Sequence, residues 1–498
     1  MRTRRRPDPG RPLGLGPLAL ALAWLGAGCG AAERPPDVVL AVVDTLRADH
    51  LSCYGYRRET SPALDRWAAG GTLYERAYAP ASWTLPSMAM LMTGRLRSDN
   101  SGDIGPLEIT LAERLADAGF ATQAVVSNPL LDAKQGYSRG FDGYQLVPTG
   151  PQRRLNGWRA DEVVERGLTA LGGLRGDRPA FLFLMFFDPH DPYEPQGGTR
   201  FAPFDEPARR RAFEAALPPA ERALLGDAEY RGIELRIALY DSEIRAVDDA
   251  LERLFAGLAQ RRPGRDTLIA LTSDHGEGLW QRARLAGEQD EPEAFFPALY
   301  SEHGVMLYEE QIHVPLILGG PRVPAGRRVA TPVSILDLAA TFEVALGLEP
   351  LGPLDGRDLL DFEALAAPRE LVAFTSRGSS LLVEGRYKLH EPRAYRSERF
   401  GARPEFYDLD RDPLELEDRF PEADRGALRA RLETWRAAGA RRPGAGRRGS
   451  VAPELLEALG YLPDLLDGGA AGDGPRVPGS GVAPGTEPAA RGGAGGGG

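Results

Sequence analysis

The chain has 498 residues, of which 42% are hydrophobic and 26% are charged. This is the composition of a globular protein, and the length suffices for one large α/β domain with a smaller appended unit. The net charge of −11 argues against a basic nucleic-acid-binding surface, so we expect no nucleic-acid partner. With only two cysteines, one of them in the N-terminal segment, the chain has no disulfide framework.

Residues 1–29 have the layout of an export signal. A strongly basic start is followed by an uncharged stretch of mainly Leu, Ala and Gly that ends at Cys29. The terminal cysteine favours a lipoprotein signal, in which Cys29 is lipidated; an ordinary cleaved signal or a single anchor helix is the alternative. We therefore expect an exported protein, periplasmic or at the cell surface, that contacts the membrane only through this lipid or a retained anchor.

Short apolar runs alternate with helical patterns along the chain. Val38 to Val43 is a continuous β-branched run, typical of a strand buried on both faces. Similar runs occur at Ala121 to Val126, Phe181 to Phe187, Thr267 to Thr272 and Val314 to Leu318. The clearest helix has apolar residues spaced by three and four from Ile237 to Leu254. The alternation predicts an α/β fold with a mostly parallel central sheet and helices on both faces.

The pattern changes near Phe374. Residues 381–390 and 405–413 indicate a small antiparallel sheet, and residues 418–438 a charged helix. A short apolar helix is expected at 455–463, before a Gly-, Ala- and Pro-rich tail that is expected to be disordered. The predicted division is a signal peptide (1–29), an α/β domain (36–370), a C-terminal subdomain (371–463) and the tail (464–498).

Acidic and imidazole side chains follow two of the predicted strands. Asp44 ends the first strand, and Asp274 and His275 follow the strand at 267–272. Ligands of such sheets bind beyond the carboxyl ends of the strands. Two carboxylates and one imidazole suit a divalent metal and leave coordination positions for a substrate. Each Asp could instead cap a helix, but only the metal interpretation accounts for all three residues together.

The segment ASWTLPSMAMLMTGR, residues 81–95, places Thr84 just before a predicted helix. Backbone N–H groups at a helix N-terminus favour a bound phosphate or sulfate. A hydroxyl there could bind the metal, lose its proton and attack phosphorus or sulfur. Thr84 could equally be a simple helix cap, and the local residues do not decide between the two roles.

Two of the six histidines lie in loops at strand ends. His190 lies in FFDPHDPYEP and His303 in SEHGVMLYEE. Either could protonate a leaving oxygen or hold anionic oxygens. Asp188 and His190 could instead join a second metal, although no third ligand has a matching spacing. The histidines interpreted as surface or packing residues are His50, His313 and His390.

Together these segments resemble the sulfatase family, within the alkaline phosphatase superfamily. VVLAVVDTLRADHLSCYGY is similar to its opening metal strand, WTLPSMAMLMTGR to its nucleophile segment, FLFLMFFDPHDPYEP to its histidine loop and LTSDHGEGL to its second metal segment. EFYDLDRDP and LGYLP resemble C-terminal elements of bacterial members. The resemblance spans roughly residues 36–463, and the order of the motifs makes it specific.

The resemblance implies a catalytic domain over 36–370 that holds one divalent metal ion and acts on an anionic ester. Carried over to this sequence, it implies metal ligands at Asp44, Asp274 and His275, a nucleophile at Thr84, and substrate or leaving-group contacts at His190 and His303.

Three positions depart from the family pattern. Sulfatases carry Cys or Ser where Thr84 stands, oxidised to formylglycine, and Arg where Met88 stands, so no formylglycine is expected. Thr45 replaces the usual second Asp, and His275 replaces the usual Asn. A nitrogen ligand in place of oxygen shifts the preference from Ca²⁺ towards Mn²⁺ or Zn²⁺, and the metal stays open among these three.

We therefore expect a metal-dependent hydrolase of an anionic ester, with phosphate esters slightly favoured over sulfate esters. A formylglycine-independent sulfatase using unmodified Thr84 is one alternative. A catalytically inactive surface protein that binds sulfated or anionic glycans is another. The polar insertion from Gln281 to Tyr300 is expected either to shape the mouth of the site or to be a plain surface loop.

Overall fold

The computed structural model describes residues 34–440 with internal gaps. The gaps are residues 100, 149–157, 175–176, 196, 204–209, 212–213, 215–221, 223–225, 284–298, 302, 350–351, 376–377, 393–403 and 420–424. The predicted signal peptide with Cys29, the helix at 455–463, the tail and most of the insertion at 281–300 lie outside the described residues. Within the part that is described, no helix is long and apolar enough to cross a membrane.

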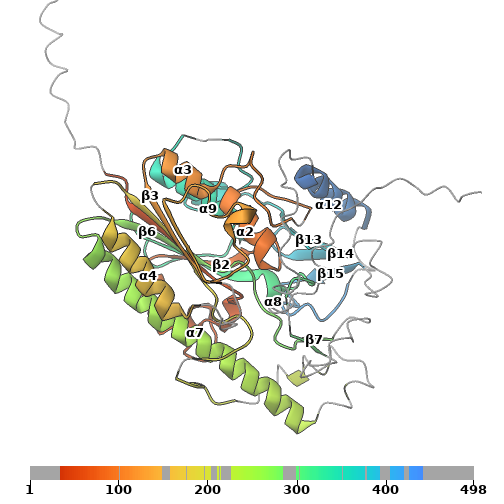
Figure 1. Cartoon of the computed structure of the whole chain (residues 1–498). Helices are drawn as coiled ribbons and strands as arrows, with labels where there is room; N and C mark the ends of the chain where they lie inside the picture. Colours follow the sequence, from red (N-terminus) through yellow and green to blue (C-terminus); the bar gives the residue numbers. More distant parts are fainter. Residues whose placement is uncertain are drawn as a thin grey trace, which may run out of the picture.

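A nine-stranded sheet forms the centre of the molecule (Figure 1). Its strands are β1 (Asp37–Val43), β2 (Thr72–Tyr78), β3 (Ala121–Val126), β4 (Gly143–Leu146), β5 (Ala180–Phe186), β6 (Thr267–Thr272), β9 (His313–Gly319), β10 (Arg327–Val329) and β11 (Val333–Ser334). The order is β10-β2-β9-β6-β1-β5-β3-β4, and β11 pairs with β2. Strand β9 runs antiparallel to β2 and β6, whereas the other pairs are parallel. The predicted α/β fold with a mostly parallel sheet is confirmed.

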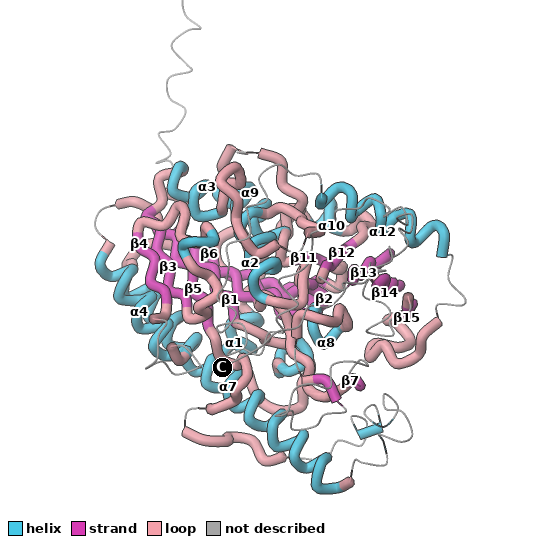
Figure 2. The backbone as a smooth tube through the Cα atoms, turned by 45° about the vertical axis from the view of Figure 1, so that its right-hand side comes forward, coloured by secondary structure: helices cyan, strands magenta, loops and turns pink. Residues whose placement is uncertain are grey.

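Helices cover both faces of this sheet (Figures 1 and 2). One face carries α1 (Pro62–Ala69), α4 (Ala160–Gly173) and α7 (Asp227–Arg261), and the other carries α2 (Thr84–Thr93), α3 (Leu111–Asp117) and α9 (Asp337–Leu346). Alternate residues of β1 point to opposite faces of the sheet and contribute to the hydrophobic core on each face. Val39 and Val43 pack with the α4 and α7 side, whereas Leu40 and Val42 pack with the α2 and α9 side. This two-sided burial explains the continuous apolar run.

A second, antiparallel sheet of four strands follows the main one. Its strands are, in order, β12 (Leu371–Phe374), β13 (Gly378–Val383), β14 (Tyr387–Pro392) and β15 (Glu405–Asp408), with α12 (Arg425–Ala440) packed against them. Lys388 of β14 joins this sheet to the main body, because its buried Nζ lies 2.9 Å from Glu309 Oε1. The remaining short elements are η1 (Ala48–His50), η2 (Ser52–Tyr54), η3 (Ala133–Gln135), α8 (Glu309–Ile312), α10 (Phe362–Leu365), β7 (Arg282–Ala283) and β8 (Leu299–Tyr300). The division at residue 370 stays a prediction.

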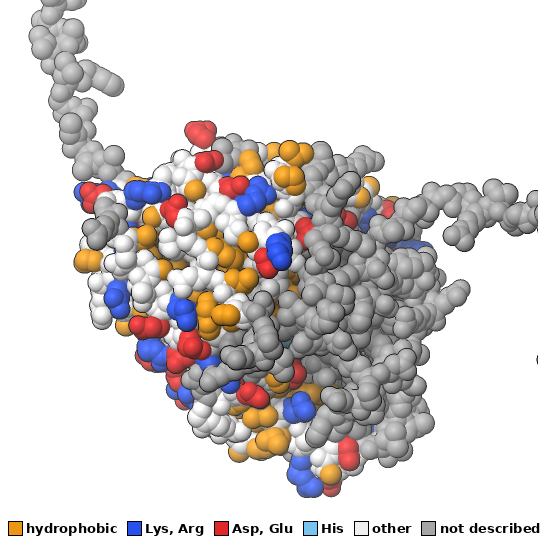
Figure 3. Space-filling view, viewed as in Figure 1, with side chains coloured by type: hydrophobic (Ala, Val, Ile, Leu, Met, Phe, Trp, Pro, Cys, Tyr) orange, Lys and Arg blue, Asp and Glu red, His pale blue; other side chains and the backbone are white. Residues whose placement is uncertain are grey.

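Charged side chains are mixed on the surface shown in Figure 3. Lys and Arg groups lie beside Asp and Glu groups there, and the described side chains of that face form no continuous basic stripe.

Strand direction decides which loops meet. The carboxyl ends of β1, β2, β3, β5 and β6 lie at one edge of the main sheet. Because β9 is antiparallel, its first residues lie at this same edge. Loops after five strands and the segment before β9 are therefore gathered in one place, where such sheets bind ligands.

At the opposite edge of the sheet, one buried carboxylate forms ion pairs with two arginines. The Asp37 carboxylate at the start of β1 accepts hydrogen bonds from Arg262 Nε and Arg265 Nε, each at 2.8 Å. It also accepts one from Ala180 N at 2.8 Å, at the start of β5. The Asp37 side chain is only 4% exposed. This carboxylate thus joins the end of α7 and the start of β5 to the strand that carries Asp44.

Replacing Asp37 with Ala should lower the free energy of unfolding by about 3–5 kcal/mol, because it leaves two largely buried guanidinium groups without their carboxylate. Urea denaturation followed by circular dichroism measures this change. Glu252→Ala is the control, since Glu252 and its partner Arg66 are 60% and 62% exposed and an exposed pair contributes at most about 1 kcal/mol. Equal losses in the two variants would contradict the structural role of Asp37.

Candidate active site and metal centre

Asp44, Asp274 and His275 meet at the carboxyl edge of the main sheet. Asp44 follows β1, and the other two residues follow β6, which pairs directly with β1. One potential ligand atom from each residue lies within 4.8 Å of the others, and all three side chains are buried. His275 Nε2 is 3.6 Å from Asp44 Oδ1 and 3.4 Å from Asp274 Oδ2. The fold therefore brings together the three residues expected to bind metal.

The donor atoms of this group fit a divalent cation. Asp44 Oδ1 and Asp274 Oδ2 are buried, and neither has a hydrogen-bond partner among the described residues. His275 Nδ1 donates to Gly276 O at 2.9 Å, so the lone pair of Nε2 is directed to the carboxylates. Burial and the nearby Asp274 carboxylate raise the pKa of Asp44, and burial lowers the pKa of His275 to about 3. Two buried carboxylates beside a neutral imidazole are stabilised by a bound positive charge.

The backbone after β1 is held by side chains from other elements. Tyr240 OH of α7 donates to Thr45 O at 2.7 Å, and Ser273 Oγ accepts from Leu46 N at 2.9 Å. Thr45 has a φ of +57°, which for a β-branched residue costs about 1–3 kcal/mol. The contacts of Tyr240 and Ser273 stabilise this backbone and so fix the direction of Asp44.

Gly276 allows the loop after β6 to lie directly against α8. Its N–H donates to Gln311 O at 2.8 Å. A Cβ at this position would lie 2.2 Å from Glu310 O, so any other residue would have to displace backbone. The close approach fixes the chain immediately after His275.

Thr84 is the first residue of α2, and Trp83 occupies the N-cap position. We expected Thr84 to lie before the helix; that expectation was wrong by one residue, because the helix begins at Thr84 itself. Its buried Oγ1 lies 3.2 Å from His275 Nε2 and 3.4 Å from Asn128 Nδ2. The hydroxyl therefore faces the candidate metal ligands, and the cap position belongs to its neighbour.

Other residues of the same segment have structural roles. Ser87 Oγ donates to Asp274 O at 2.6 Å and so ties α2 to the loop after β6. Met88, at the position where sulfatases carry Arg, is fully buried in the core between α2 and the sheet. An arginine here would need to bury its charge in an apolar cluster, which is strongly unfavourable without a partner.

Asn128 is a site residue that the sequence reasoning missed. It follows β3 and donates from Nδ2 to Asp44 Oδ2 at 2.6 Å, while the same nitrogen lies 3.4 Å from Thr84 Oγ1. Its Oδ1 accepts from Leu130 N at 2.9 Å, which settles the orientation of the amide. The rule that singled out Asp44 would have found it, because β3 ends at the same edge of the sheet.

His190 and His303 lie beside the candidate metal ligands. His190 follows β5, and His303 precedes β9. The ring centroid of His303 lies 4.5 Å from that of His275 and 4.9 Å from that of His190. Burial lowers the pKa of each ring to about 3, so all three are neutral at pH 7. A bound anion would raise their pKa values and favour proton donation towards it.

Glu277 is a second residue that the sequence reasoning missed. Its Oε1 lies 3.0 Å from His303 Nδ1, which places His303 Nε2 on the opposite side of the ring. Burial, followed by the charge of Asp191, raises the pKa of Glu277 well above its usual range. The residue stands in the motif SDHGEGL, but its partner comes from a separate segment and could not be read from the motif.

Asp188 does not join a metal group. Its Oδ2 accepts from Ala160 N at 2.9 Å, and its Oδ1 lies 3.7 Å from Arg159 Nη1. Within the described ranges, the set of Asp44, Asp274 and His275 is the one cluster suited to a metal ion. The alternative of a second metal at Asp188 and His190 is therefore not supported.

The other three histidines make packing and polar contacts. His50 Nδ1 lies 2.6 Å from Asp241 Oδ1, His313 Nε2 lies 2.9 Å from Glu75 O, and His390 Nε2 lies 2.9 Å from Glu415 Oε1.

A family model described as Sulfatase matches residues 36–348, which include every residue of this site. The chain belongs to the sulfatase family. The resemblance stated from the sequence motifs is thereby confirmed, and family membership supports hydrolysis of an anionic ester as the activity of this protein.

Individual relatives agree with this assignment. Mouse steryl-sulfatase is 28% identical to this chain over 440 residues, and the match covers 70% of this chain and 69% of the mouse protein. The phosphonate monoester hydrolase of Agrobacterium radiobacter has a TM-score of 0.58 at 23% identity, covering 81% of this chain and 96% of the other. A structure in complex with D-glucosamine-2-N,6-O-disulfate has a TM-score of 0.61 at 17% identity, covering 86% and 98%. At these identities the two solved structures show that the fold is shared.

Replacing Asn128 with Ala should lower kcat/KM for the best ester substrate, or the metal affinity, by about 10–100-fold, because the variant removes a hydrogen bond that orients Asp44. Steady-state kinetics at saturating metal, together with metal titration, measures the two effects separately. Ser127→Ala is the control, since Ser127 Oγ donates to Trp158 O, outside the site. The assignment fails if Asn128→Ala behaves like this control.

Proposed function

We propose that this member of the sulfatase family is a metal-dependent hydrolase that cleaves phosphate mono- or diesters with Thr84 as the nucleophile. One observation carries the proposal: Thr84 Oγ1, at the start of α2, lies 3.2 Å from His275 Nε2. The orphaned oxygens of Asp44 and Asp274 beside it support a metal-assisted reaction.

Binding of the ester relies on groups that favour negative charge. The N-terminal turn of α2 presents backbone N–H groups and the positive end of the helix dipole beside Thr84. His303 lies beside His275, and His190 lies beside His303; both rings can donate to anionic oxygens. The site thus surrounds an anionic group with donors while its carboxylates hold the cation. When bound, a divalent cation supplies positive charge that lowers the pKa of the Thr84 hydroxyl and offsets the charge of the ester.

Thr84 Oγ1 attacks phosphorus, and the bond between phosphorus and the leaving oxygen breaks. The Thr84 hydroxyl loses its proton to solvent water, and the leaving oxygen takes a proton from His190 or His303, whichever ring the bound anion has caused to be protonated from solvent. Asn128 Nδ2 donates to Oγ1 as negative charge develops there. Water then hydrolyses the phosphothreonine, which returns a proton to Thr84 and releases phosphate from a monoester substrate or a phosphate monoester from a diester substrate.

The identity of the nucleophile favours phosphate over sulfate. Formylglycine expels sulfate by C–O cleavage through its gem-diol, whereas a threonine ester has no second hydroxyl on its carbon. A phosphonate monoester hydrolase with the same fold is in keeping with chemistry at phosphorus. A formylglycine-independent sulfatase is the second candidate, favoured by sulfatase relatives such as mouse steryl-sulfatase.

Thr84→Ala should abolish turnover of nitrophenyl phosphate and of bis-nitrophenyl phosphate, because it removes the attacking oxygen, while the metal content stays unchanged. Thr84→Ser is the matched control, since it keeps the hydroxyl and should retain turnover. Initial rates and elemental analysis of the same preparations provide the two measurements. Full activity of Thr84→Ala would exclude Thr84 as the nucleophile.

Two further measurements separate the alternatives. A higher kcat/KM for nitrophenyl sulfate than for nitrophenyl phosphate would favour the formylglycine-independent sulfatase. Removal of metal by a chelator should abolish turnover, and Mn²⁺, Zn²⁺ or Ca²⁺ should restore it. Protein without bound metal or turnover, but with affinity for sulfated glycans, would favour the inactive binding protein.

We also propose that the protein is exported and lipidated at Cys29, on the basis of the basic, apolar and cysteine-terminated order of residues 1–29. Cell fractionation tests this localisation. Cys29→Ala should move the protein from the membrane fraction to the soluble periplasmic fraction, and an unchanged distribution would exclude the lipid anchor.

A further inference from the structure

One arginine contacts both ends of the loop that carries His190. This loop, residues 187–194, leaves the end of β5. At its start, Asp188 Oδ1 lies 3.7 Å from Arg159 Nη1, and at its end Glu194 O accepts from Arg159 Nη1 at 2.7 Å. The Arg159 side chain is only 12% exposed. A single guanidinium group therefore spans the base of the loop.

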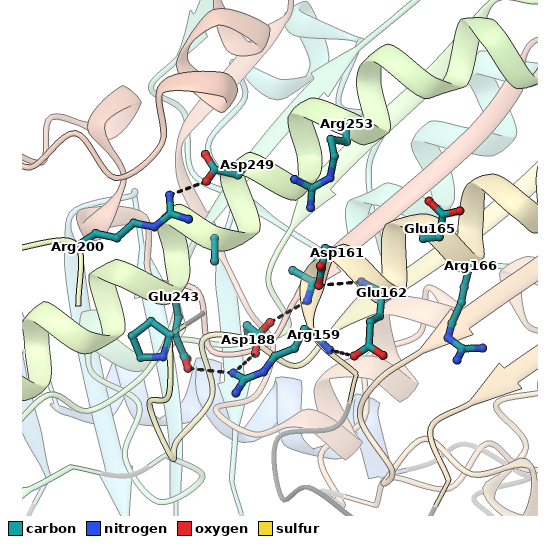
Figure 4. A pocket seen from close by; sticks show the side chains of 13 residues that line it. Arg159, Asp161, Glu162, Glu165, Arg166, Asp188, Arg200, Glu243, Asp249 and Arg253 are labelled. Atoms are coloured by element: carbon teal, nitrogen blue, oxygen red, sulfur yellow. Dashed lines mark hydrogen bonds and ion pairs between the residues drawn. The ribbon is translucent and has the colours of Figure 1, made fainter. Parts of the chain in front are cut away.

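Two buried carboxylates complete this contact, and we call Arg159, Asp188 and Glu243 the loop clamp. Glu243 of α7 accepts from Glu194 N at 2.6 Å and lies 3.8 Å from Arg159 Nη1. Asp188 accepts from Ala160 N at 2.9 Å, at the start of α4. Figure 4 shows both carboxylates directed to the Arg159 side chain. The clamp therefore fixes the loop against α4 and α7 at once.

The ring of His190 follows the backbone of this loop. His190 N donates to Phe187 O at 2.8 Å, and its Nδ1 donates to Asp191 O at 2.6 Å. The ring also stacks on Phe187, with centroids 4.5 Å apart. Because these three contacts are internal to the loop, a shift of the loop would move His190 relative to His303 and Thr84.

The Arg159 guanidinium group also allows the carboxylates of Asp188 and Glu243 to be buried close together. Burial raises the pKa of Asp188 to about 6 and raises that of Glu243 well above its usual range, while the Arg159 charge opposes both shifts. Without Arg159, both acids would lose the cation that they contact in a poorly solvated environment. Loss of the arginine is therefore expected to loosen the loop rather than leave it in place.

The clamp lines a cavity of about 650 Å³. The exposed side chains of Arg166 and Arg253 lie at its other side (Figure 4). The exposed rim gives small solutes a route to Asp188 and Glu243 from solvent. This access makes a chemical rescue experiment feasible.

We propose that Arg159 is a positioning residue for the reaction, which holds the His190 loop in its active arrangement through Asp188, Glu194 and Glu243. The inference rests on the proposed function, in which His190 contacts the substrate or its leaving group. Arg159 itself acts only through the loop.

Kinetics of Arg159→Gln test this role. Because misplacement of a substrate-contacting group by about 1 Å lowers rates about 100-fold, kcat/KM should fall by roughly that factor. The control is Arg166→Gln, which lines the same cavity but stacks on Trp158, with its Cζ 4.1 Å from the ring centroid; its rate should stay unchanged. In the His190→Ala background, Arg159→Gln should cause no further loss. A further loss of the same size there would overturn the proposal.

Chemical rescue distinguishes positioning from general destabilisation. Millimolar guanidinium chloride should restore part of the kcat/KM of Arg159→Ala, because the ion can enter the cavity and pair with Asp188 and Glu243. It should not affect Arg166→Ala. Failure to restore any rate would contradict the proposal. If Arg159→Ala does not fold, Arg159→Lys takes its place and should give an intermediate rate, since one ammonium group cannot span both ends of the loop.

Hydrogen exchange provides a measurement that does not depend on activity. Amides of residues 187–194 should exchange faster in Arg159→Gln than in the wild type and in Arg166→Gln. Faster exchange with an active Thr84→Ala variant would mean that the clamp exists but the proposed function is wrong. Unchanged exchange together with unchanged kcat/KM would mean that the clamp is wrong, whatever the fate of Thr84.

Discussion

The mutual repulsion of two carboxylates buried side by side is the constraint on which the arrangement of this site depends. Asp44 and Asp274 end neighbouring parallel strands, so the sheet itself forces them together. A cation held by these residues would relieve the repulsion, and the surrounding groups fit one. Asn128 Nδ2 donates to Asp44 Oδ2, and the lone pair of His275 Nε2 is directed to the two carboxylates. The Thr84 hydroxyl is held at the boundary between this acidic group and the donors of α2.

Local features of the sequence were enough to predict the first strand of the main sheet and the residues that meet at its end. The apolar run before Asp44 identified a strand buried on both faces, and polar residues at strand ends identified the ligand group. The start of α2 was misplaced by one residue, because the N-cap is occupied by Trp83, a residue with no capping signature. Asn128 was overlooked although it follows β3 at the same edge of the sheet, whereas Glu277 escaped notice because its partner His303 lies in another segment. The clamp around Arg159 was invisible for the same reason, since it joins α4, α7 and the loop after β5.

Within the segment of α2, Thr84 and Met88 depart from the family pattern. Ser87 still ties α2 to the loop after β6, so the nucleophile position is kept. Met88 fills core volume where the family places a charged group, and the helix packs without a buried guanidinium. The backbone thus keeps Thr84 facing the candidate metal ligands, although its side chain differs from the one that the family carries there.

The antiparallel direction of β9 has a consequence for how this enzyme can diversify. The chain leaves the sheet edge after β6 and returns to the same edge before β9, so the intervening segment begins and ends at the site. The entropic cost of closing such a loop grows only with the logarithm of its length. Insertions and deletions between β7 and β8 alter neither the strands of the main sheet nor Asp274, His275 and His303. Selection can therefore alter the rim that a substrate meets while the reacting groups stay fixed.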